Sequence, residues 1–384
     1  MIKKQQFSRE IYYNNAMKIL YVITSTETGG AEKALASLAR AVTKAGHRVR
    51  VVCLKPLGPV AQEMQQNDIE VKSIFAKLPG KAVRKLKEEI KLFQPDIVHA
   101  MLFRAIEYTR MACAGQSVKL VVTPHFDLSK KSFFLRVLDS LLKGIDTLAV
   151  AESLSTAEYL IQHQGYKKDK VYLLPNGVDK TVFYPDSSLR EKMRKQYGFH
   201  VKTTVFICVA RLAAVKDPVT LVQAFRNVWK RNPDVRLVYI GEGEERAKLE
   251  FYIRESGMEK VVILAGEQHN INAYLNMADV FVLSSIEESL PLALLEALCV
   301  GLPCVVSRVG DMPRWVEHGE NGYVCPPQDI TLLSCFLNLL ADNEQQRKTM
   351  GEKSLEKSSQ ITDDLTQYQQ LYQQVINGEF SREN

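Results

Sequence analysis

SSIEESLPLALLEALCVGLPCVVSRVGDMPRWVEHGENGYVCPPQ, residues 284–328, is the most informative stretch of this 384-residue chain. The apolar run ADVFVLSS leads into it, so we expect Glu288 at the carboxyl end of a strand and Glu296 about one turn inside the following helix. Pro291 suits the first helical position, and the backbone N–H groups after it lack partners within the helix. Because such a helix end attracts anions, the stretch predicts two carboxylates beside an anion-binding turn.

Apolar, strand-like runs alternate with helical patterns along the whole chain, which is typical of parallel sheets with crossover helices. The runs of the first half are MKILYVITS, HRVRVVCL, PDIVHAM, KLVVTPH, TLAVAES and VYLLPNGVD. After the polar stretch 186–202 the rhythm restarts with TVFICVARL, VRLVYIGEG, VVILAG, ADVFVLSS and LPCVVS. The two similar halves predict an α/β protein of two Rossmann-like domains, with ligands bound beyond the carboxyl ends of the strands.

Composition places the chain among globular proteins with more than one core. Hydrophobic residues make up 46% of it, which is ample for two domains of this length. Apolar stretches stay shorter than the roughly eighteen residues of a membrane span, and the first sixteen residues are polar. The seven scattered cysteines form no C-x-x-C pair and are typical of core thiols in a reducing compartment. We therefore expect a cytoplasmic protein.

The net charge of +6 is unevenly distributed along the chain. Residues 1–180 carry 28 Lys and Arg against 17 Asp and Glu, whereas residues 181–384 carry 22 against 27. The densest basic stretch, KAVRKLKEEIKLF at 81–93, spaces Val83, Leu86, Ile90 and Phe93 at helical intervals. This pattern suits an anionic membrane surface, and it equally suits an ordinary helix that buries one apolar stripe in its own domain.

Two glycines follow the first predicted strand in the loop TSTETGGAEK, where a helix begins. Gly29 and Gly30 permit close backbone approach and positive φ, so this helix start can contact an anionic group. A simple glycine turn is the alternative. The loop lacks the full G-x-G-x-x-G fingerprint, which argues against a dinucleotide enzyme.

The second half opens with a pair of cations in VARLAAVKDP. Arg211 ends a strand, and Lys216 follows in the connecting loop just before the next helix. Two cations at one strand end can neutralise a diphosphate, most of all when a leaving nucleotide gathers charge. Ordinary surface charges are the alternative. The chain has no D-x-D triplet to hold Mg²⁺, so basic side chains and a helix end would replace the metal.

Two histidines lie near predicted strand ends in the first half. His125, in KLVVTPHFD, comes just past a strand, where it can share a proton with a hydroxyl group or orient it. His99, in PDIVHAM, is more internal to its strand, and a hydrogen-bonded structural histidine explains it at least as well. His125 is therefore the candidate catalytic histidine.

Taken together, these residues resemble the retaining, nucleotide-sugar-dependent glycosyltransferases of glycosyltransferase family 4. The similarity runs from MKILYVITSTETGGAEK through LLPNGVD and VARLAAVKDP to the block ADVFVLSS–GENGYVCPP. It implies the GT-B fold, in which two Rossmann-like domains with parallel sheets face an interdomain cleft. Residues 1–180 would form the acceptor domain and 181–362 the nucleotide-sugar domain, with a terminal helix of about 363–377 packing back on the first.

The resemblance also assigns roles to individual residues. It implies that Glu288 holds the hydroxyls of the donor sugar and Glu296 the ribose of the nucleotide. It places Arg211 and Lys216 on the diphosphate, and it makes His125 the active-site histidine on the acceptor side. The remaining donor-binding positions are Gly29 and Gly30 of the first loop and the stretch Ser289, Leu290, Pro291 and Leu292. Many relatives have E-G-F-G where this chain has Glu288-Ser289-Leu290-Pro291, which leaves the donor sugar open.

The implied function is transfer of a hexose or N-acetylhexosamine from a UDP- or GDP-sugar to an acceptor hydroxyl, with retained anomeric configuration and without metal or other cofactor. The basic first half indicates an acceptor that is a lipid-linked or cell-envelope glycan intermediate, at the inner face of the membrane. A non-catalytic sensor or partner subunit that binds nucleotide sugar is one alternative. Nucleic-acid binding is disfavoured because the 81–93 stretch has no aromatic residue besides Phe93.

Overall fold

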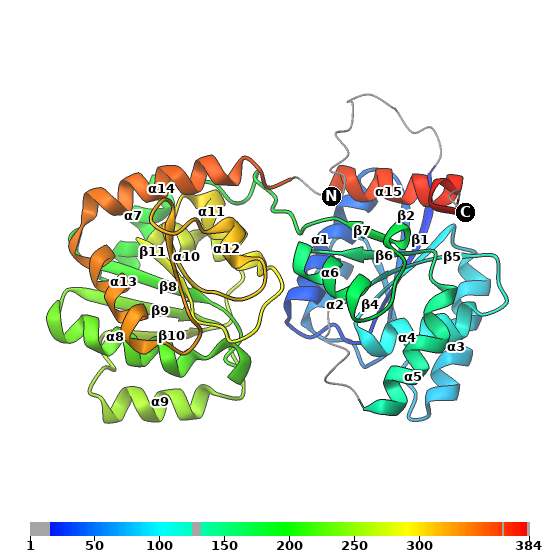
Figure 1. Ribbon diagram of the computed structural model, residues 1–384, viewed down its shortest axis with the longest axis horizontal. Helices are drawn as coiled ribbons and strands as arrows, with labels where there is room; N and C mark the ends of the chain where they lie inside the picture. Colours follow the sequence, from blue (N-terminus) through cyan, green and yellow to red (C-terminus); the bar gives the residue numbers. More distant parts are fainter. Residues whose placement is uncertain (1–15, 125–131, 363–364, 382–384) are drawn as a thin grey trace. The chain divides into compact units, whose positions relative to one another are not determined.

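The computed structural model of the chain describes residues 16–124, 132–362 and 365–381 (Figure 1). These residues form two separate sheets, one of seven strands and one of six. By their contacts they divide into two units, the first running to Ala149 and resuming at Tyr368, the second spanning Val150–Gln367. The domain boundary expected after residue 180 lies between the strands of the two sheets but not where the units divide, so it stays a prediction.

The first sheet has the strand order β3-β2-β1-β4-β5-β6-β7, which begins with the Rossmann order 3-2-1-4-5. Its strands are β1 Lys18–Ile23, β2 Arg48–Cys53, β3 Glu70–Ser73, β4 Ile97–Met101, β5 Lys119–Thr123, β6 Leu148–Ala151 and β7 Val171–Leu173. From β3 to β6 each strand pairs in parallel with its neighbour, in a register such as Ile19↔Ile97. Six of the seven were expected from apolar runs, and β3 was missed because EVKS is short and polar.

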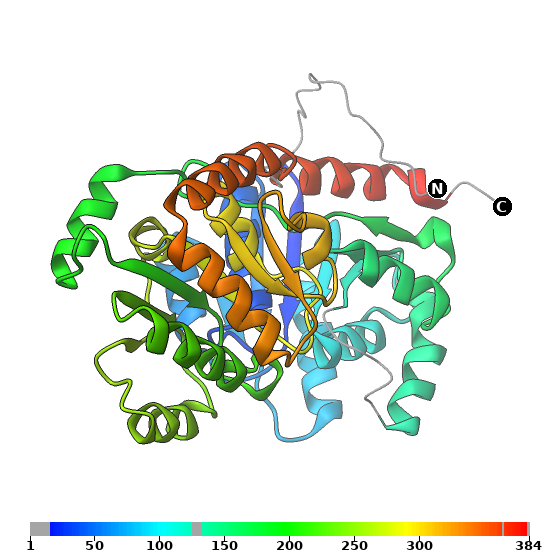
Figure 2. The same cartoon turned by 60° about the vertical axis from the view of Figure 1, so that its left-hand side comes forward.

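Helices connect these strands. They are α1 Gly30–Lys44, α2 Pro59–Gln65, α3 Pro79–Phe93, α4 Phe103–Cys113, α5 Phe133–Leu142 and α6 Leu154–Gln162. Both views show α3, α4 and α5 side by side, and α4 packs against each of the other two (Figures 1 and 2). Along α3 the buried residues are Ala82, Leu86, Ile90 and Phe93. Its apolar stripe is therefore buried inside its own unit, in agreement with the interpretation of this segment as an ordinary helix that buries one apolar stripe. None of the described helices is long and apolar enough to cross a bilayer.

The last helix, α15 (Leu365–Asn377), contributes to the first unit through a buried tyrosine. The Tyr372 hydroxyl lies 2.7 Å from His99 Nδ1 and donates to the Tyr21 hydroxyl at 3.2 Å. The other ring nitrogen of His99 lies 2.7 Å from Thr123 Oγ1. His99 is thus a fully buried, hydrogen-bonded histidine within the sheet, in agreement with its structural interpretation.

The second sheet has the order β10-β9-β8-β11-β12-β13, again the Rossmann pattern. Its strands are β8 Thr204–Val209, β9 Val235–Ile240, β10 Val262–Gly266, β11 Val280–Leu283, β12 Cys304–Ser307 and β13 Gly322–Cys325. The helices of this half are α7 Ser187–Gln196, α8 Pro218–Arg231, α9 Arg246–Glu255, α10 Ile271–Met277, α11 Leu292–Val300, α12 Met312–Trp315, α13 Ile330–Asp342 and α14 Glu344–Ser358. One large cluster of buried aliphatic and aromatic side chains fills the space between this sheet and its helices.

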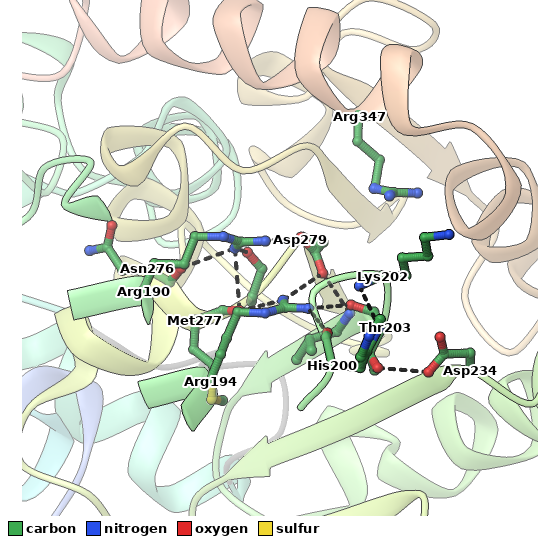
Figure 3. A network of polar contacts seen from close by, with 12 residues as sticks. Arg190, Arg194, His200, Lys202, Thr203, Asp234, Asn276, Met277, Asp279 and Arg347 are labelled. Carbon is green, nitrogen blue, oxygen red and sulfur yellow. Dashed lines mark hydrogen bonds and ion pairs between the residues drawn. The ribbon is translucent and has the colours of Figure 1, made fainter. Parts of the chain in front are cut away.

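Asp279, just before β11, organises the amino ends of the two central strands (Figure 3). Its Oδ2 accepts from the backbone N–H of Val205 on β8 at 2.7 Å and from Arg194 at 3.1 Å. Its Oδ1 accepts from Arg190 at 2.5 Å. Both arginines come from α7, and Arg194 also donates to the carbonyl of Thr203. Because bidentate and charge-assisted bonds of this kind fix geometry, the network holds β8 and β11 side by side.

A second buried charge cluster lies among the helices of the first unit, around Arg110 of α4. The guanidinium donates to Glu107 at 2.6 Å, to Asp139 of α5 at 2.8 Å, and through two nitrogens to Asp146 at 3.0 and 2.7 Å. All four side chains are at most 2% exposed. Three carboxylates face one cation, so burial, together with the charges of Asp139 and Asp146, raises the pKa of Glu107 to about 7.

This cluster predicts an unusual pH dependence of stability. Between a pKa near 4.5 in the unfolded chain and about 7 in the folded one, the folded state binds more protons at Glu107. Its contribution to stability therefore falls as pH rises through this window, by up to ~3 kcal/mol. The variant Glu107→Gln should gain stability relative to wild type on going from pH 5 to pH 8, in urea unfolding of both proteins. Parallel pH curves for the two would contradict the raised pKa.

Candidate functional site

The candidate site lies where the order of the second sheet reverses. β8 pairs with β9 on one side and with β11 on the other, in the register Val280↔Phe206 and Phe281↔Ile207. The connections that leave β8 and β11 therefore run in opposite directions along the sheet, and in sheets of this kind ligands bind beyond the carboxyl ends of the strands at such a point. The two loops there are 210–217, with the predicted cations, and 284–291, with the first predicted carboxylate.

Backbone contacts tie these two loops to each other. The N–H of Ile286 donates to the carbonyl of Val215 at 2.8 Å. The hydroxyl of Ser284 donates to the carbonyls of Lys216 and Asp217, at 3.2 and 2.9 Å. Asp217 itself adopts φ +46° and caps α8 by accepting from the N–H of Thr220. Side chains of the two loops are consequently presented from one connected framework.

Lys216 and Glu288 meet directly on this framework. Lys216 Nζ lies 2.5 Å from Glu288 Oε1, which also accepts from the Ser285 hydroxyl at 2.8 Å. The lysine side chain is 24% exposed and the carboxylate 8% exposed. Cys208 and Tyr239 are buried near enough to interact electrostatically with this pair, and burial raises the pKa of both groups, that of Cys208 to about 12. Both groups stay neutral at ordinary pH and add no further charge near the Lys216–Glu288 pair.

Arg211 has a fixed backbone and a free side chain. Its guanidinium is 61% exposed and lies 4.0 Å from Glu244, which is 62% exposed. The strand exit after β9 runs against the neighbouring main chain, since a Cβ on Gly241 would lie 2.0 Å from the carbonyl oxygen of Ala210. A Cβ on Gly243 would lie 2.2 Å from the carbonyl oxygen of Leu212, and both glycines have positive φ. The main chain on either side of Arg211 is thus pressed against glycine backbone, while its side chain extends to solvent.

The helix after Glu288 begins one residue later than expected. Pro291 has φ −71° and ψ 127°, which is extended, so it is the N-cap of α11 and Leu292 is the first helical residue. A proline side chain cannot accept a hydrogen bond, which leaves the first N–H groups of this helix uncapped by it. Glu296 lies a little more than one turn inside α11, half-buried. The expected arrangement of carboxylate, turn, helix start and second carboxylate is therefore present along the chain.

Residues 288–290 are held by groups that sequence reasoning did not single out. The Ser289 carbonyl accepts from the N–H of Asp311 at 2.9 Å, and its hydroxyl lies 2.7 Å from that of Ser153. Gly310 makes this approach possible, because a Cβ there would lie 2.3 Å from the backbone carbonyl oxygen of Glu288 and 2.4 Å from the carbonyl oxygen of Ser289. The signal was available in the pair Gly310-Asp311, which follows β12 at the same edge of the sheet.

The site residues predicted in the first half are Gly29, Gly30 and His125, and the structure describes the two glycines but not the histidine. Gly29 is the N-cap of α1 with φ −155°, and Gly30 is exposed at the first position of that helix. Neither is among the glycines of positive φ, so this loop does not use the backbone freedom that the two glycines permit. Extended backbone suffices here because the chain enters α1 directly from the loop. The roles of both glycines in donor binding stay predictions, and His125 lies outside the described residues.

No set of three or more His, Cys, Asp or Glu side chains among the residues that the structure describes is placed to hold a metal ion. Independence from metal stays a prediction.

Comparison with known proteins agrees with this architecture. Residues 28–182 match the family described as Glycosyltransferase Family 4, and residues 189–357 match Glycosyl transferases group 1. Among solved structures, Alr3699/HepE of Anabaena, in a complex with UDP and glucose, has a TM-score of 0.84 at 23% identity, over 94% of this chain and 99% of that one. The two parallel α/β units thus have the GT-B fold.

Curated relatives point to the same class. The N-acetyl-alpha-D-glucosaminyl L-malate synthase of Bacillus anthracis is 27% identical over 73% of this chain and 75% of its own. The UDP-Gal:alpha-D-GlcNAc-diphosphoundecaprenol alpha-1,3-galactosyltransferase of Escherichia coli is 33% identical over 44% of each chain. The protein is a glycosyltransferase. It belongs to glycosyltransferase family 4.

The contact at Gly310 yields a matched pair of variants. Gly310→Ala, at φ +53°, must push the Glu288 and Ser289 carbonyls away, whereas Gly319→Ala, at φ +87°, adds a methyl group in open space. We expect Gly310→Ala to cost roughly 1–3 kcal/mol more than Gly319→Ala in urea unfolding, and to weaken nucleotide binding selectively. Equal behaviour of the two variants would show that the close approach is unimportant.

Proposed function

We propose that the chain transfers a hexose or N-acetylhexosamine from a UDP- or GDP-sugar to an acceptor hydroxyl, with retention of anomeric configuration. The observation that carries this proposal is the Lys216–Glu288 ion pair at the point where the strand order of the second sheet reverses, with Glu288 in the loop that leads into the start of α11. A cation, a carboxylate and free backbone N–H groups in one place suit the diphosphate and the hydroxyls of such a donor. UDP and glucose in the complex of the Anabaena relative support the same donor chemistry.

In this proposal the ion pair is a resting state that the donor rearranges. Lys216 exchanges Glu288 for the diphosphate, joined by Arg211, whose exposed side chain is free to move. Glu288, still held by Ser285, then accepts hydrogen bonds from sugar hydroxyls. Glu296 binds the ribose, and the stretch Ser289–Leu292 together with Gly29 and Gly30 completes the donor site.

The chemical step follows from the position of the charges. The bond between the anomeric carbon and the diphosphate oxygen breaks, and the two cations with the α11 start stabilise the negative charge that develops. The acceptor oxygen forms its bond on the same face of the sugar, and its proton passes to the departing diphosphate. No protein nucleophile and no metal takes part, while His125 orients the acceptor hydroxyl.

For the acceptor we propose a lipid-linked or cell-envelope glycan intermediate, reached from the cytoplasmic side by an enzyme bound peripherally to the inner face of the membrane. The excess of 28 Lys and Arg over 17 Asp and Glu in residues 1–180 supports this. So does the E. coli relative, whose acceptor is a diphosphoundecaprenol-linked sugar by its name. A sensor or partner subunit that binds nucleotide sugar would keep Glu296 but would not need the whole set of Arg211, Lys216, Glu288 and His125, so the presence of all four in the sequence favours the enzyme.

The cations provide one test. Lys216→Ala and Arg211→Ala should each lower turnover by about 10²-fold or more, if each contributes roughly 3 kcal/mol to the leaving diphosphate. Arg254→Ala, at an exposed arginine of α9, is the control and should leave turnover unchanged. Product formation with a panel of UDP- and GDP-sugars is the measurement. Near-normal rates in both site variants would remove their role.

The roles proposed for Glu288 and Glu296 can be tested separately. Glu296→Ala should weaken binding of the free nucleotide, because it removes the ribose contact, whereas Glu288→Ala should leave nucleotide affinity nearly intact and lower transfer. Calorimetric titration with UDP and GDP separates the two effects from turnover. If the Glu296 variant bound nucleotide as tightly as wild type, the ribose assignment would be incorrect.

A further inference from the structure

Helix α5 of the first unit has its apolar side turned outward. Its sequence is FFLRVLDSLL, yet Asp139 is the residue of this helix that is buried. Phe133, Phe134 and Leu141 are 75%, 72% and 75% exposed, and Val137 is 40% exposed. A helix with this many large apolar residues normally buries them against its own domain. Here the opposite face is the one that packs.

The buried charge cluster explains this orientation. At about 100° per residue, positions 133, 134, 137 and 141 fall within an arc of about 100°, and position 139 falls on the other side. Asp139 is bound to Arg110 at 2.8 Å with both side chains 1% exposed. Turning the apolar face of α5 inward would break this buried ion pair and leave the Arg110 cluster without one of its carboxylates, so the ion pair favours the orientation in which Asp139 turns inward.

The surroundings of the exposed face are basic. Between Phe133 and Ile145 the sole acidic residue is the buried Asp139, whereas Arg136 is exposed and Lys143 is partly exposed. The Arg136 guanidinium lies 6.0 Å from the centre of the Phe133 ring. In the same helix layer, across α4, helix α3 exposes five cations, namely Lys81, Arg84, Lys85, Lys87 and Lys91, against one exposed carboxylate, Glu88, which pairs with Arg84.

We propose that α5 is a membrane-docking element, which seats Phe133, Phe134 and Leu141 at the boundary between headgroups and acyl chains of an anionic bilayer. Exposed apolar residues flanked by cations are what such an interface takes up. A second copy of the chain fits less well, because a twofold contact through α5 would bring Arg136 towards its own equivalent. The choice of a membrane as the partner rests on the proposed function, namely transfer to a lipid-linked acceptor. The exposure of the apolar face of α5 is independent of that proposal.

The test is binding of the full chain to vesicles of phosphatidylcholine with about one third phosphatidylglycerol, measured by co-sedimentation. Phe133→Ser with Phe134→Ser in one protein should weaken binding at least about tenfold, since both phenyl rings lose their burial among the acyl chains. Arg136→Glu should weaken it at low salt and less at 0.5 M NaCl, where charges are screened. The matched controls are Phe251→Ser, at a 58% exposed phenylalanine of α9, and Arg254→Glu; both should bind as wild type does.

Each result decides the matter. Wild-type vesicle binding by the double serine variant overturns the proposal, and so does a lipid-free dimer, seen by sedimentation velocity, that this variant abolishes. Unchanged thermal unfolding of the variants excludes loss of fold, because the substituted side chains are exposed. Nucleotide-sugar binding and hydrolysis of the donor, measured without lipid, report on the proposed function separately. Loss of vesicle binding with intact donor hydrolysis is the expected combination.

Discussion

The lateral pairing of β8 with β11 is the constraint on which the candidate site depends. Asp279 and the two arginines of α7 hold the amino ends of these strands together. At the carboxyl ends, Ser284 and the N–H of Ile286 bind the carbonyls of residues 215–217. Lys216 and Glu288, 72 residues apart, come within 2.5 Å only because both ends are fixed. Because both loops are fixed in this way, a charged ligand can replace one partner of the pair through side-chain movement, while the backbone stays in place.

Much of the second half was predictable because its signals are local. Apolar runs bounded by turns identified β8 to β12, and the sequence around Glu288 placed a loop and a helix after β11. What failed depended on a single backbone angle or on short polar segments. Pro291 has ψ 127° and therefore lies before α11 rather than in it. The proline ring restricts φ but leaves ψ open, so the sequence does not tell whether this residue is helical. The strand β13, GYVC, was not predicted because a run of four residues is too short to be recognised alone. Its pairing with β12 makes it a strand.

The helices of the first unit show where periodicity stops being informative. The pattern of α3 correctly predicted a coherent apolar stripe, and the stripe is buried. The pattern of α5 is as strongly apolar, yet its orientation follows from Arg110, which lies 29 residues before Asp139 in the chain. Spacing indicates which residues share a face. Whether that face turns inward depends on partners that are distant in sequence, and here a buried charge outweighs several exposed apolar side chains.

The glycine contacts beside Arg211 have a consequence for how tightly a ligand can be held. Since Gly241 and Gly243 leave no room for the adjacent main chain to shift, only the torsions of the Arg211 side chain remain available for reaching an anion. Ordering such a chain costs on the order of 2 kcal/mol of conformational entropy. This arginine would therefore contribute to ground-state affinity only weakly, and its attraction would be felt most once the anion's charge has grown.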